Sequence, residues 1–161
     1  MSLPEEHVEP FQAAYQAASL SCHPINQTGA VICVGHEFVY GSDITVGEEY
    51  IDYLNVDRSE YLCSAISVAI YNAVKSGKST AQSAVYCTGF HSKAQANEAF
   101  KAIALSGIRT LYVHDSRQPS LVYLPSLSMI HFAGIEWIDV SGKVFKDDSL
   151  SIRCNGQRFY P

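Results

Sequence analysis

The chain has 161 residues, a formal net charge of −5 and a hydrophobic fraction of 47%. This length and composition predict one compact domain, residues 1–161, with a core large enough for two or three layers. The acidic balance argues against general binding to nucleic acids or to anionic membranes, because both need a basic surface. No apolar stretch approaches the roughly 20 residues that span a bilayer, and the acidic start of the sequence is unlike a secretory signal.

The five cysteines are widely spaced and form no C-x-x-C pair. An odd number of dispersed cysteines indicates buried thiols in a reducing compartment rather than a disulfide framework. We therefore expect a soluble, cytoplasmic protein.

Hydrophobic periodicity predicts helices and strands that alternate along most of the chain. Helical spacing marks residues 5–20, 59–76, 93–105 and 121–132, whereas residues 42–57 have no clear period and predict a long loop. Apolar runs predict strands at 29–35, 36–41, 83–88, 109–114 and 135–140. The first two strands are joined tightly and should be antiparallel, whereas the three later ones, each reached through a helix, should be parallel. The predicted fold is α/β, a five-stranded mixed sheet between two helical layers, and residues 142–161 form a hairpin or a C-terminal extension.

Three local sequences along this order resemble motifs of the cytidine/deoxycytidylate deaminase superfamily. Thr28–Ile32 (TGAVI) is similar to the first strand of that family, typically QVGAVIV. Cys63–Ile70 (CSAISVAI) stands where the family has C-x-HAEMNAI, and Ser106–Tyr112 (SGIRTLY) stands where it has AGIKRVVY. The resemblance covers roughly residues 5–140 and implies the three-layer α/β/α fold of that family. The helix between the last two strands places it nearer the deoxycytidylate and tRNA deaminases than the small cytidine deaminases.

The family's reaction uses zinc held by one His or Cys and two Cys, with a Glu that carries protons. On the alignment that the resemblance implies, the His position is Ser64, the Glu position is Ile66, and the two Cys positions are Ala96 and Ala99. Serine and alanine offer zinc neither a thiolate nor an imidazole, and isoleucine cannot carry a proton. The resemblance therefore implies the scaffold without its metal, and we expect no cofactor and no catalysis.

Other residues nearby could rebuild a metal site. Cys63 precedes Ser64, and Cys87 with His91 has a C-x3-H spacing. A packed helix thiol, a buried strand thiol and a solvated loop histidine explain these residues more simply, because cysteine is among the most often buried residue types. Ser64 has no histidine and acid at a recognisable spacing, so packing explains it better than nucleophilic catalysis does.

Several residues could still contact a bound nucleotide. Asn26 and Gln27 precede the first strand and could meet a base or sugar, although loop hydrogen bonding is the commoner role of such a pair. Asp43 stands where the family has an Asn that holds the sugar, and its charge would oppose a 5′-phosphate while still bonding a ribose hydroxyl. Glu98 lies near a helix start, where the helix dipole favours an acid. The candidate ligand-binding residues are therefore Asn26, Gln27, Asp43, Ser64, His91 and Glu98.

Three functions follow from this pattern. The favoured one is a catalytically inactive deaminase-fold protein that binds a nucleotide, a nucleotide-like ligand or a protein partner, as a homo-oligomer or as the inactive partner of another subunit. The second is an active enzyme, either a deoxycytidylate- or cytidine-type deaminase with a non-standard zinc site or a different hydrolase. The third is a purely structural oligomeric component. A small chain that keeps such a scaffold without its catalytic groups would suit a viral or defence-related role.

Overall fold

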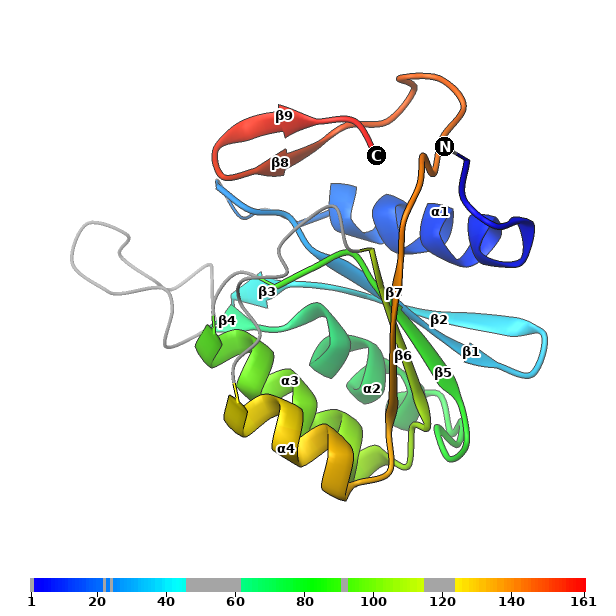
Figure 1. The fold of residues 1–161 in the computed structure, drawn as a ribbon, viewed down its shortest axis with the longest axis vertical. Coiled ribbons are helices and arrows are strands. Elements are labelled where there is room, and N and C mark those ends of the chain that lie inside the picture. Colours follow the sequence, from blue (N-terminus) through cyan, green and yellow to red (C-terminus); the bar gives the residue numbers. More distant parts are fainter. Residues whose placement is uncertain (1, 22, 24, 46–61, 91–92, 115–123) are drawn as a thin grey trace.

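A five-stranded sheet forms the centre of the molecule, with its strands in the order β2–β1–β5–β6–β7 (Figure 1). The computed structural model describes residues 2–21, 23, 25–45, 62–90, 93–114 and 124–161. The strands of this sheet are β1 (Gly29–Val34), β2 (Glu37–Ser42), β5 (Ala84–Cys87), β6 (Thr110–His114) and β7 (Glu136–Val140). β1 is antiparallel to both β2 and β5, whereas β5, β6 and β7 are parallel. The predicted mixed sheet is confirmed.

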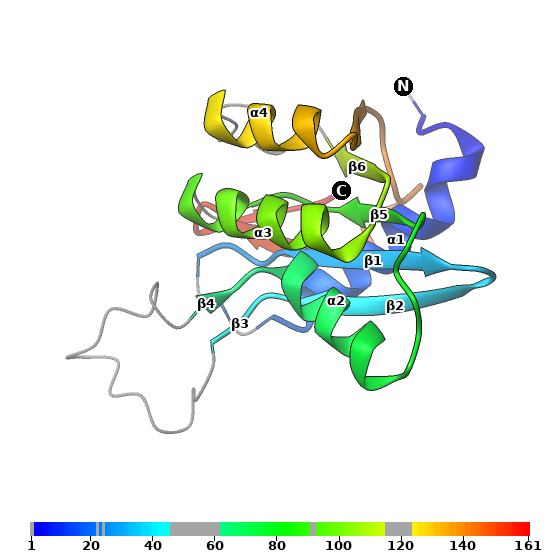
Figure 2. The same cartoon turned by 90° about the horizontal axis from the view of Figure 1, so that it is seen from below.

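Helices cover both faces of this sheet. α1 (Glu5–Ser19) lies on one face, and α2 (Ala65–Lys75), α3 (Lys93–Ser106) and α4 (Leu124–Phe132) lie together on the other (Figures 1 and 2). The three-layer α/β/α architecture is confirmed. Among the described residues, no helix combines the length and the apolar character that crossing a bilayer requires.

β1 is apolar along its whole length because residues on both of its faces pack into the core. In β1, Ala30 and Ile32 belong to the core cluster that packs against α2 and α3. Val31, between them, belongs to a second cluster with α1 and the C-terminal segment. This two-sided burial explains why residues 29–34 show a continuous apolar run rather than the alternation of a half-exposed strand.

Two glycines let helices approach the sheet very closely. A Cβ atom on Gly41 would lie 2.3 Å from the carbonyl oxygen of Ala65 and 2.4 Å from the main-chain nitrogen of Ala69. On the other face, a Cβ atom on Gly29 would lie 2.1 Å from the carbonyl oxygen of Ala14. Glycines on the strands and alanines on the helices thus determine where α1 and α2 lie on the sheet. The close packing of α2 also determines where its N-terminal turn lies.

The helix predicted over residues 59–76 starts too early. Residues 59–61 lie outside the described residues, and Leu62–Cys63 form a short strand, β4, which pairs with β3 (Ile44–Thr45). Ser64 has extended backbone angles, φ −64° and ψ 150°, and its side chain caps the helix that begins at Ala65. The predicted loop over 42–57 is also interrupted by β3, and its residues 46–57 lie outside the described part.

The C-terminal segment crosses the α1 face and ends in a hairpin of β8 (Ile152–Cys154) and β9 (Gln157–Phe159). The two residues between these strands, Asn155 and Gly156, have φ values of 54° and 76°. Such a turn requires a positive φ at both central residues, and Asn-Gly is the sequence that adopts it most readily. Ile152 packs into the core cluster on the α1 side, so the hairpin is anchored to that layer.

Substituting Gly41→Ala should lower the free energy of unfolding by about 3 kcal/mol, the upper end of the usual cost of overpacking. The cost is high because the added methyl would meet main-chain atoms of α2, which cannot rotate away. Urea unfolding would measure the loss. Gly35→Asn is a suitable control, since a Cβ at Gly35 meets nothing within 4 Å and its φ of +61° suits asparagine. Similar small losses in both variants would contradict the close approach.

Candidate functional site

The N-terminal turns of α2 and α3 are joined by a chain of hydrogen bonds. The hydroxyl of Ser64 donates to Ser67 Oγ (2.9 Å) and accepts from the main-chain N–H of Ser67 (3.1 Å). Ser67 Oγ in turn donates to Glu98 Oε1 over 2.6 Å. The N-cap of α2 is therefore linked through one hydroxyl to a carboxylate on α3.

This arrangement gives Glu98 a role that its own helix does not explain. The carboxylate bonds Ser67, which lies in the first turn of α2, where the partial positive charge of the helix dipole is greatest. Glu98 therefore interacts with a helix start, as predicted, but the start is that of α2 rather than of its own helix, α3. The Ser64–Ser67–Glu98 chain stabilises the junction and leaves a partly exposed carboxylate at its end.

The four positions that the resemblance assigns to zinc chemistry are all buried at this junction. Ile66, Ala96 and Ala99 have no exposed surface, and Ser64 is 2% exposed. The three apolar residues belong to a single core cluster with Phe100. Three of the four positions that the resemblance assigns thus carry alkyl groups, which have no donor atoms, and the Ser64 hydroxyl serves as a helix cap. These residues do not fit a zinc ion.

The two described cysteines that the sequence offers as substitute ligands have different surroundings. Burial raises the pKa of the half-buried Cys63 thiol, and the negative charge of Glu98 raises it further. The Cys87 thiol is buried and donates to the carbonyl oxygen of Gly89. His91 lies outside the described residues.

No group of three or more His, Cys, Asp or Glu side chains in the described part of the chain is arranged to hold a metal ion.

Asp43 points into the protein. Its carboxylate accepts hydrogen bonds from the main-chain N–H of Thr28 (2.6 Å), the Thr28 hydroxyl (2.8 Å) and the Ser21 hydroxyl (2.7 Å). It is 2% exposed, and these donors offset the cost of burying its charge. Asp43 therefore ties the start of β1 to the end of β2, and its contact with a sugar remains a prediction.

Asn26 and Gln27 hold the C-terminal hairpin in place. Gln27 Oε1 accepts from the main-chain N–H of Arg153 (2.7 Å), and Asn26 Oδ1 accepts from that of Asn155 (2.8 Å). Both side chains are buried. These contacts are the loop hydrogen bonding that the sequence favoured, and a ligand role for either residue remains a prediction.

Two residues at these contacts were missed at the sequence level. Ser67 lies three residues after Ser64, a spacing that suits contact within the first helical turn, but nothing in the sequence indicates Glu98 as its partner. Arg153 lies 126 positions after Gln27, and no local pattern predicts so distant a pair.

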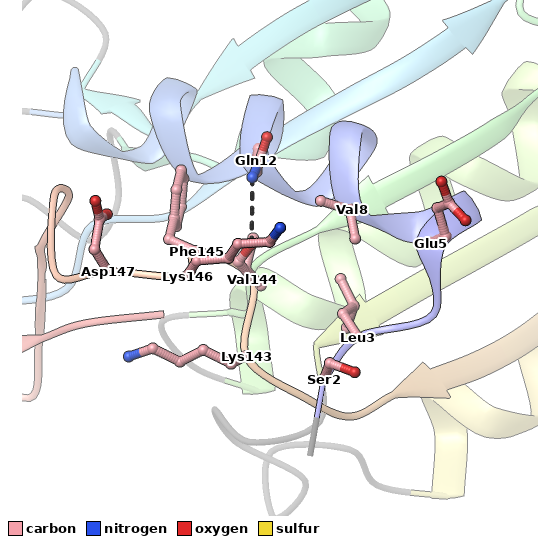
Figure 3. A pocket seen from close by; sticks show the side chains of 10 residues that line it. All are labelled: Ser2, Leu3, Glu5, Val8, Gln12, Lys143, Val144, Phe145, Lys146 and Asp147. Carbon is pink, nitrogen blue, oxygen red and sulfur yellow. Dashed lines mark hydrogen bonds between the residues drawn. The ribbon is translucent and has the colours of Figure 1, made fainter.

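A separate cavity of about 570 Å³ lies on the other face of the sheet, between α1 and residues 143–147 (Figure 3). Gln12 bridges it by donating from Nε2 to the carbonyl oxygen of Val144 over 3.3 Å. Its lining carries both acidic and basic side chains, including Glu5 and Lys146. It contains none of the four positions assigned to zinc chemistry.

No family model and no curated protein sequence matches this chain. Solved structures do match. The dCMP deaminase of cyanophage S-TIM5 in apo form has a TM-score of 0.66 at 18% sequence identity, over 84% of this chain and 98% of that chain.

A complex of the cyanophage enzyme with dCMP and dUMP has a TM-score of 0.54 at 16% identity, over 83% of this chain and 91% of that chain. A diaminohydroxyphosphoribosylaminopyrimidine deaminase/5-amino-6-(5-phosphoribosylamino)uracil reductase from Thermotoga maritima has a TM-score of 0.55 at 19% identity, over 83% of this chain and 36% of that chain. At these identities the likeness concerns the fold, which this chain shares with those deaminases.

Replacing Glu98→Gln should speed the alkylation of Cys63 by iodoacetamide at pH 8. Removing the negative charge lowers the pKa of the Cys63 thiol, so more of the reactive thiolate is present at a given pH. The glutamine keeps an oxygen that can accept from Ser67. Peptide mass spectrometry would follow each cysteine separately.

Cys33 is the internal control, because burial and then Glu9, rather than Glu98, raise its pKa to about 11. Its alkylation rate should not change in the variant. An unchanged rate at Cys63 would contradict its placement beside Glu98.

Proposed function

We propose that this chain, which has the fold of the dCMP deaminases, performs no deamination and works by binding. The proposal rests on one observation: the four residues that the resemblance aligns with the zinc ligands and the proton-carrying acid are buried, and they carry one hydroxyl (Ser64) and three alkyl groups. Ile66, Ala96 and Ala99 have no exposed surface.

Zinc-dependent deamination needs a metal-bound water and an acid that carries its proton. Ala96 and Ala99 have no donor atom, and the side chain of Ile66 cannot hold a proton. Glu98 is an acid at this junction, and its carboxylate accepts from Ser67. Without a metal to acidify a water molecule, no water gives up a proton to Glu98 to form hydroxide.

The same junction suits a bound ligand that offers hydrogen-bond donors. Glu98 is partly exposed, and a carboxylate accepts but does not donate. Ribose hydroxyls and the amino groups of bases are donors of this kind, whereas a phosphate beside Glu98 would be repelled. A nucleoside or nucleotide-like molecule with its phosphate directed away from Glu98 is therefore the ligand class that we favour at this site.

Self-assembly is a second form of binding that the surface supports. α2, α3 and α4 form one layer (Figure 2), and each of them carries a large exposed apolar side chain. Leu105 on α3 is 90% exposed, Phe132 on α4 is 86% exposed, and Val74 on α2 is 69% exposed. Apolar residues gathered on one layer are typical of surfaces that contact a partner or a second copy.

The triple variant Ser64→His/Ala96→Cys/Ala99→Cys should bind about one zinc ion per chain, since it supplies the three ligands of a catalytic zinc site. The native chain should bind none after dialysis against a chelator. Elemental analysis gives the stoichiometry, and the absorption of bound Co²⁺ reports tetrahedral thiolate coordination. The double variant Ala96→Cys/Ala99→Cys is the matched control and should bind more weakly.

Failure of a folded triple variant to gain zinc would show that the three positions do not converge. Stoichiometric zinc in the native chain, lost in Cys63→Ala or Cys87→Ala, would instead support an active enzyme with a non-standard metal site.

Nucleosides and nucleotides should raise the melting temperature of the native chain if the fold binds them, because a ligand that binds only the folded state stabilises it. At a ligand concentration of 100 times Kd the gain is about 2.7 kcal/mol. Differential scanning fluorimetry against mono-, di- and cyclic nucleotides and free nucleosides would test this. Glu98→Ala should reduce the shift, and Ser128→Ala, an exposed change on α4, should not.

No shift with any of these compounds would leave a partner-binding or purely structural role. Sedimentation equilibrium would then show whether the chain self-associates.

A further inference from the structure

The C-terminal hairpin is locally basic in an otherwise acidic chain. Residues 149–161 contain two arginines and no acidic side chain, whereas the net charge of the chain is −5. The two arginines, Arg153 in β8 and Arg158 in β9, are direct partners across the hairpin. Directly opposite side chains project from the same face of a strand pair, where like charges repel.

The main chain of Arg153 shows how closely these side chains are placed. Its N–H donates to Gln27 Oε1 (2.7 Å), and its carbonyl oxygen accepts from the main-chain N–H of Gln27 (2.9 Å). Both groups therefore point away from β9, so Arg153 and Arg158 form a non-hydrogen-bonded pair. In such pairs the Cα atoms are only about 4.5 Å apart, and the side chains are closer than in hydrogen-bonded pairs.

The Arg153 guanidinium is fixed by carbonyl oxygens rather than by an acid. Nε donates to the carbonyl oxygen of His23 (2.9 Å), and Nη2 donates to that of Ser21 (3.3 Å). A guanidinium has five N–H donors, so two are used and three remain. Within the part of the chain that the structure describes, Arg158 makes no side-chain hydrogen bond, and neither arginine forms an ion pair.

Both arginines line a cavity of about 340 Å³, together with Gln27, Ser151 and Gly156. This volume is at the small end of the range for ligand pockets, about 300–1,000 Å³. The side-chain amide of Gln27 already donates to two carbonyl oxygens, and its Oε1 accepts from the main-chain N–H of Arg153. The Ser151 hydroxyl adds a neutral donor beside the two charged ones.

We propose that Arg153, Arg158 and Ser151 form a binding site for the phosphate group of a small molecule. A phosphate monoester carries a charge of about −1.5 to −2 at neutral pH, which offsets both guanidinium charges, whereas a carboxylate offsets one. Each guanidinium can give two parallel hydrogen bonds to phosphate oxygens. The site lies on the α1 side of the sheet, where Ile152 packs, and is independent of the α2–α3 junction.

Isothermal titration calorimetry with inorganic phosphate tests the site, with chloride keeping the ionic strength constant. The native chain should bind phosphate, and Arg158→Gln should weaken binding at least about tenfold, since charge-assisted hydrogen bonds are lost. Arg158→Lys should fall between them, because it keeps the charge but loses the paired donors. Arg158 is exposed and has no side-chain hydrogen bond to a described residue, so these variants should fold normally.

Arg109→Gln is the matched control, since it removes one exposed arginine before β6, at the end of the sheet far from Gln27. It should bind phosphate as the native chain does. A nucleoside 5′-monophosphate that binds more tightly than inorganic phosphate would identify an organic ester as the ligand, and equal affinities would identify phosphate alone. Undetectable phosphate binding by the native chain, or an unchanged Kd in Arg158→Gln, would overturn the proposal.

Discussion

The close packing of α2 against the sheet determines where the N-terminal turn of this helix lies. Gly41 lets the helix rest directly on the sheet, where any Cβ would collide with the main chain of α2. Ser64 sets the residue at which the helix starts, and Ser67 links that start to Glu98 on α3. The N-terminal turns of the two helices are thus held together by hydrogen bonds and apolar contacts.

Apolar packing and hydrogen bonds together stabilise this junction. A zinc site contributes binding energy to a fold that holds one. Here Ile66, Ala96 and Ala99 contribute buried apolar surface, and the Ser64–Ser67–Glu98 chain links polar groups of the two helices. The buried residues on the two helices are therefore physically consistent with one another.

The sequence predicted the fold well because periodicity and helix stops are local signals. The paired β1–β2 hairpin, the three parallel strands and the stop at Gly107, with φ +79°, all follow from residues close together in the chain. The start of α2 was missed because apolar residues before Ser64 continue the helical spacing, while pairing with β3 makes two of them a strand. The inward orientation of Asp43 and the contact between Gln27 and Arg153 depend on distant residues, which periodicity does not encode.

We propose that this chain has the deaminase fold without deaminase activity. The most direct test is to incubate the purified chain with dCMP, CMP, deoxycytidine and cytidine in zinc-supplemented buffer. Chromatography would then separate any dUMP, UMP, deoxyuridine or uridine that forms. We expect product to form no faster than with heat-denatured protein. Product that increases with protein concentration and is abolished by a chelator would contradict this account.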